Sequence, residues 1–171
     1  MLKKFFRHRK YKKMIKVSSL FILDEFANVV NNTINRLEKD GRIKTPLHKE
    51  VLKFESTALV FWLFRESSIF PELLHKLILD EMHDQYYVRL KKRGYDRNAV
   101  QAVCDDLNLR YKTYDKFIDS DDDFVKVGTN FAKFVSERSK TDLDVTEIII
   151  PAELTEKITS KFKEFRKVMQ L

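Results

Sequence analysis

Four polar residues stand among apolar ones at positions that a helix would turn inward: His48, Glu55, His75 and Arg110. At about 100° per residue, Glu55 falls inside the apolar arc of a predicted helix, and His48 lies two turns earlier on the same side. An ionised carboxylate inside a helical bundle is costly unless it is paired. Three interpretations follow: Glu55 forms an ion pair with Arg110 or His75, the four residues line a small polar pocket with Glu55 and His75 as acid–base or ligand groups, or Glu55 reaches solvent along a shallow groove.

Two acid–histidine pairs have the spacing that carboxylate-bridged di-metal proteins use, Glu72 with His75 and Asp80 with His83. Such a centre needs the motif on two helices, whereas both pairs fall on one predicted helix with the two histidines directed apart. The acidic run at 119–123 lacks the glycine and the glutamate that a calcium-binding EF-hand loop requires. We therefore expect neither a metal ion nor another cofactor.

No arrangement of residues indicates a catalytic nucleophile. The single cysteine, Cys104, lies on a predicted apolar helix face, where packing is its usual role. Only three glycines occur, and they are too scattered to build a phosphate-binding loop. These observations favour a non-enzymatic protein, with a ligand-binding or enzymatic bundle around Glu55, His75 and Arg110 as the alternative.

The net charge of +7 originates in the first sixteen residues. This segment contains no acidic residue and eight basic ones: Lys3, Lys4, Arg7, Arg9, Lys10, Lys12, Lys13 and Lys16. The remaining 155 residues carry 25 basic and 26 acidic side chains and are therefore close to neutral. A basic segment attached to a neutral body points to an anionic partner for that segment.

Two partners suit the basic segment: the phosphates of a nucleic acid, or an anionic membrane surface into which Leu2, Phe5 and Phe6 could insert. The third interpretation is a solvated segment that binds nothing specific. We expect an interaction or scaffold protein that binds an anionic partner, a protein partner or a second copy of itself. The segment from Val17 to Leu23 contains two serines and is followed by Asp24 and Glu25, so we do not expect a secretory signal. We expect a cytoplasmic protein, with a mitochondrial presequence as the weaker alternative.

The scarcity of glycine and proline, three of each in 171 residues, predicts long helices with few turns. We expect an all-α fold, a single bundle of about six helices. Helices are predicted from about Tyr11 to Gly41, from Pro46 to about Arg65, from Pro71 to Arg93, from Arg97 to Ile118, from Ser120 to about Ser139 and over 151–169. The helix over 46–65 becomes apolar all round in its second half, which is typical of the centre of a bundle.

Two further local predictions concern the ends of the chain. The first ten residues do not continue the apolar stripe that begins near Tyr11, so residues 1–10 are expected to form a separate arm, free to be flexible, beside one domain over 11–171. Residues 140–150 are rich in β-branched side chains and precede Pro151, which favours an extended crossover or a short strand. On the fifth helix, Gly128 lies within the apolar face and is expected to let a neighbouring helix approach closely.

Overall fold

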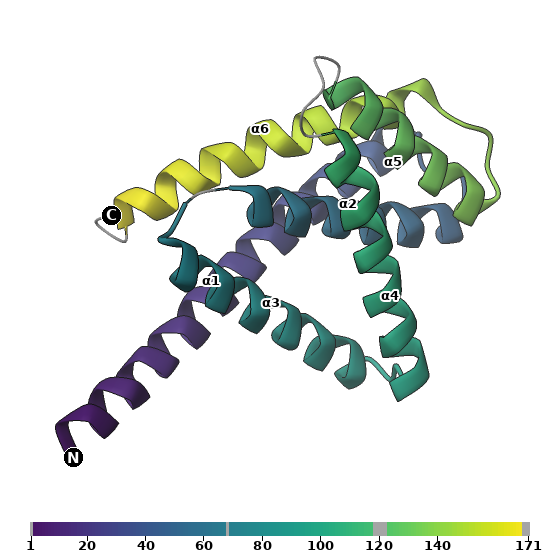
Figure 1. Cartoon of the computed structure of the whole chain (residues 1–171). Coiled ribbons are helices and arrows are strands. Elements are labelled where there is room, and N and C mark those ends of the chain that lie inside the picture. Colours follow the sequence, from purple (N-terminus) through teal and green to yellow (C-terminus); the bar gives the residue numbers. More distant parts are fainter. Residues whose placement is uncertain (1, 68, 118–122, 169–171) are drawn as a thin grey trace.

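The structure, a computed structural model, describes residues 2–67, 69–117 and 123–168. The described residues form an all-α bundle (Figure 1), as the composition predicts, and contain no strand. Its helices are α1 (Leu2–Lys39), α2 (Pro46–Glu66), α3 (Glu72–Lys92), α4 (Arg97–Tyr114), the 3₁₀ helix η1 (Asp115–Phe117), α5 (Asp123–Ser139) and α6 (Val145–Val168).

Helix α2 is the centre of the bundle. It packs against each of the other five α-helices, and its second half is buried on every side, with Leu59, Phe61 and Phe64 at 1% exposure or less. Its start is fixed by Thr45, whose hydroxyl accepts a hydrogen bond from the His48 amide at 3.0 Å, followed by Pro46 in the first turn. The prediction of a central apolar helix is therefore confirmed.

Helix α1 begins at Leu2, so the predicted start near Tyr11 is wrong. Residues 2–10 contain no proline or glycine and are rich in lysine and arginine, which have good helix propensity and can extend a helix that is already nucleated. The absence of an apolar stripe over these residues is therefore no evidence against a helix. In Figure 1 the N-terminal end of α1 projects beyond the ends of the other helices.

Helix α6 begins at Val145, so the predicted extended crossover at 140–150 is wrong from that residue onward, and only residues 140–144 form the connection between α5 and α6. Asp144 caps the helix by accepting the amide of Thr146 at 2.9 Å and its hydroxyl at 2.6 Å. Ile150 and Pro151 are both buried within the helix. Packing against the bundle thus outweighs the extended preference of a residue that precedes proline.

The close approach predicted at Gly128 is confirmed. A Cβ atom at this position would lie 2.4 Å from the backbone oxygen of Ile148 on α6. Two other boundaries differ by a few residues: α4 ends at Tyr114 and continues as η1, and α5 is helical from Asp123, while Ser120 lies outside the described residues.

Candidate functional site

Glu55 and Arg110 form the ion pair that the sequence suggested. Glu55 on α2 is fully buried, and Arg110 on α4 is 2% exposed. The guanidinium donates from Nε to Oε2 at 2.9 Å and from Nη2 to Oε1 at 2.6 Å, a two-point contact that matches the carboxylate geometry. Of the three interpretations of Glu55, the structure agrees with the first.

Aromatic and polar neighbours complete this pair. The Arg110 guanidinium lies 3.9 Å from the ring centre of Phe134. Arg138, near the end of α5, reaches Glu55 Oε1 at 3.5 Å and Asp106 at 2.8 Å. Burial alone would lower the pKa of Arg110, but the hydrogen bonds and charge of Glu55 outweigh it and raise the pKa. Both oxygens of Glu55 are engaged, so this carboxylate holds α2, α4 and α5 together and does not face a ligand.

His48 belongs to a second buried pair that the sequence did not predict. Its Nδ1 accepts the amide of Lys44 at 3.2 Å, so Nε2 carries the proton and donates to Oε1 of Glu147 at 2.9 Å. Burial raises the pKa of Glu147 to about 7, assisted by the charge of Asp144. Burial likewise lowers the pKa of His48. The pair joins the first turns of α2 and α6.

His75 lies apart from both pairs. Its ring stacks on that of Phe64 with 4.5 Å between the ring centres, and no hydrogen bond or ion pair among the described residues joins it to Glu55. Burial lowers the pKa of His75, which favours its neutral form. The structure thus does not bring the four predicted pocket residues together: Glu55 and Arg110 form an ion pair, His48 is hydrogen-bonded to Glu147, and His75 stacks on Phe64.

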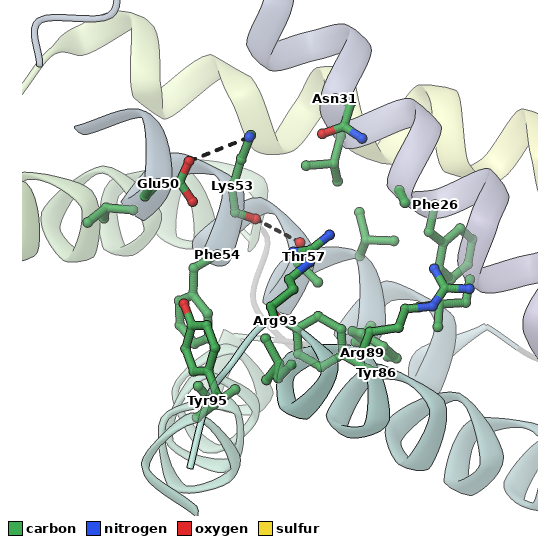
Figure 2. Close-up of a pocket in the computed structure, with 18 of the residues that line it drawn as sticks. Phe26, Asn31, Glu50, Lys53, Phe54, Thr57, Tyr86, Arg89, Arg93 and Tyr95 are labelled. Atoms are coloured by element: carbon green, nitrogen blue, oxygen red, sulfur yellow. Dashed lines mark hydrogen bonds and ion pairs between the residues drawn. The ribbon is translucent and has the colours of Figure 1, made fainter. Parts of the chain in front are cut away.

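A cavity of about 360 Å³ opens on another face of α2, between α1 and the C-terminal end of α3 (Figure 2). None of the four candidate residues lines it. Aromatic and cationic side chains do, among them Phe54, Tyr86, Arg93 and Tyr95. The sequence carries no signal for this cavity, because its walls come from segments far apart in the chain.

A surface in the N-terminal half of α1 combines apolar and cationic side chains. Four residues at three- or four-residue spacing lie on one face and are 37–58% exposed: Tyr11, Met14, Val17 and Phe21, the exposed stripe. Three exposed lysines accompany it: Lys12, Lys13 and Lys16. None of these lysines forms an ion pair with a described residue, and within residues 11–17 only Ile15 is buried.

In the part of the chain that the structure describes, no cluster of three histidine, cysteine or acidic side chains could hold a metal ion. No described helix is both long enough and apolar enough to cross a membrane. Comparisons with protein-family models, with curated proteins and with solved structures find no match to this chain. The functional argument therefore depends on the surfaces of the bundle itself.

Proposed function

We propose that this protein is a non-enzymatic interaction protein that binds an anionic lipid surface through the N-terminal half of α1. The observation that carries the proposal is the exposed stripe of Tyr11, Met14, Val17 and Phe21 beside exposed lysines that form no ion pair with a described residue. A helix that lies on a membrane surface buries apolar side chains at the headgroup boundary while its lysines attract anionic lipids.

The apolar side chains decide between a membrane and a nucleic acid. Lysines suit both partners, because both present phosphate groups. Met14 and Val17 are exposed aliphatic side chains that could not stack on bases and would gain nothing from phosphate contacts. On a lipid surface the same side chains leave water, and each buried methylene group contributes roughly 0.8 kcal/mol. The combination therefore favours lipid.

The charge of the chain supports the same assignment. Residues 1–16 contain eight basic and no acidic side chains, whereas the rest of the chain is nearly neutral. A membrane would thus attract one end of the molecule and orient it, with α1 towards the lipid. The projection of α1 beyond the other helices leaves this end accessible (Figure 1).

Co-sedimentation with vesicles tests the proposal. We would compare vesicles of phosphatidylcholine alone with vesicles that contain phosphatidylglycerol, at low and high salt. The charge variant replaces three lysines of α1 with glutamine: Lys12→Gln, Lys13→Gln and Lys16→Gln. A control variant loses the same charge from exposed lysines elsewhere: Lys91→Gln, Lys92→Gln and Lys112→Gln.

Each lysine near an anionic surface contributes about 1 kcal/mol, so the charge variant should bind roughly a hundredfold more weakly than wild type. The control variant should bind nearly as wild type does. Replacing Met14 and Val17 with serine should also weaken vesicle binding. Equal binding by the charge variant and wild type would contradict the proposal. Tight binding to duplex DNA without binding to anionic vesicles would instead identify a nucleic-acid partner.

A further inference from the structure

Both apolar and polar side chains line the cavity beside α2. Leu23, Phe26 and Val30 of α1 and Val60 and Phe61 of α2 supply apolar lining. Ligand sites of roughly 300–1,000 Å³ are typically lined by such side chains with a few polar groups among them, and this cavity of about 360 Å³ falls in that range. The apolar lining suits the body of an organic molecule.

Cations outnumber acids among the charged side chains that line the cavity. Four cations but one acid line it: Lys53, Arg89, Arg93, Arg138 and Glu50. Three of the cations have carboxylate partners: Lys53 with Glu50 at 3.5 Å, Arg89 with Asp24 at 2.7 Å and Arg138 with Asp106 at 2.8 Å. Arg93 has no ion-pair partner in the described part of the chain. One positive charge therefore remains without a counter-charge.

Hydroxyl groups lie near that free charge. The pKa of Tyr86 is raised to about 12 by burial and by Tyr95, while Arg93 opposes the rise, so these three side chains lie within electrostatic reach of one another. Tyr86 consequently stays protonated at neutral pH and can donate a hydrogen bond. In Figure 2 the Arg93 side chain extends towards Thr57 between the walls of the cavity. The Arg93 guanidinium and the Tyr86 phenol therefore both line the cavity and influence each other electrostatically.

We propose that this cavity binds a small organic monoanion, with its carboxylate or sulfonate on Arg93 and Tyr86 and its apolar or aromatic body against Phe26 and Phe61. A single anionic group matches the single unpaired cation. A guanidinium presents donors in a planar fork that suits both acid groups. This binding is separate from the membrane contact of α1 and does not depend on it.

Two fluorescent probes of similar shape test the proposal in solution: the anion 8-anilinonaphthalene-1-sulfonate and the uncharged N-phenyl-1-naphthylamine. Arg93→Gln removes the free charge at an exposed position, so the variant should fold. Its control is Arg97→Gln, which removes an exposed arginine that does not line the cavity. Ala27→Phe fills the cavity from the α1 wall, and circular dichroism verifies that each variant is folded.

Arg93→Gln should weaken binding of the anion about tenfold or more, since hydrogen bonds to charged groups are the strong ones, and leave the neutral probe unchanged. Arg97→Gln should alter neither probe, and a folded Ala27→Phe should lose both. An unchanged affinity of Arg93→Gln for the anion would overturn the proposal, because the probe would then be bound elsewhere. Unchanged binding of both probes to folded Ala27→Phe would overturn it equally.

Discussion

Replacing Arg110 with methionine would expose how strongly the bundle depends on its central ion pair. The substitution keeps an unbranched side chain of similar length and removes the charge. Glu55, which is fully buried, would lose both of its close hydrogen bonds, at 2.6 and 2.9 Å. Its remaining partner would be Arg138, whose Nη1 lies 3.5 Å from Oε1 and whose side chain is 40% exposed.

The size of the effect follows from these contacts. Removing one member of a buried ion pair costs about 3–5 kcal/mol, because the other member is left charged and poorly solvated. The partly exposed ion pair of Glu55 with Arg138 offsets at most about 1 kcal/mol of this cost. We therefore expect Arg110→Met to lower the free energy of unfolding by about 3 kcal/mol. A second variant, Arg110→Met with Glu55→Leu, removes both charges and should lie within about 1 kcal/mol of wild type.

Urea unfolding at neutral pH measures the free energy of unfolding of the single and the double variant. The single tryptophan, Trp62, is 8% exposed and packs on Tyr114, so its emission should report the loss of the core. Circular dichroism provides an independent signal for two-state behaviour. A loss below 1 kcal/mol for Arg110→Met would refute the reasoning, as would a double variant that is as unstable as the single one.

Two other predictions concern α5 and α6. Gly128→Ala should destabilise the protein by about 1–3 kcal/mol despite the better helix propensity of alanine, because the new Cβ would lie 2.4 Å from the Ile148 oxygen. Thermal unfolding tests this against Thr129→Ala, an exposed control on the same helix. An equal Tm for the two variants would contradict the prediction. The raised pKa of Glu147, about 7, means that the folded state favours the protonated acid. Stability from this group is complete below pH 4.5 and is lost as the pH rises to 7, so wild type should lose stability relative to Glu147→Gln over that interval; a constant difference from pH 4.5 to 7 would exclude this effect.

The sequence predicted those features that depend on local signals or on one helix face. Thr45 and Pro46 marked the start of α2, and the apolar run after Glu55 marked its place at the centre. The lack of a side chain at Gly128 indicated a close helix contact. The pairing of Glu55 with Arg110 could also be predicted, because a carboxylate on a buried helix face is costly unless it is paired, and Arg110 lies at the edge of another apolar face.

Other features depend on contacts between distant segments and could not be predicted. Ile150 and Pro151 favour an extended backbone locally, but burial against the bundle makes this segment helical. Glu147 consequently lies in the first turn of α6 and contacts His48. This pairing was missed because the segment was predicted to be extended. The walls of the cavity likewise come from five helices, α1 to α5, and from the turn between α3 and α4, and no residue in it is distinctive in the sequence alone.

A fluorophore placed within the exposed stripe of α1 tests the central claim most directly. In a Cys104→Ser background, Val17→Cys carries an environment-sensitive nitrobenzoxadiazole label, and Leu109→Cys on α4, also about half exposed in wild type, serves as the control. We expect anionic vesicles to shift the emission of the label at position 17 to the blue, the shift to reverse at high salt, and the label at position 109 to stay unchanged. No shift at position 17, or equal shifts at both positions, would contradict the account.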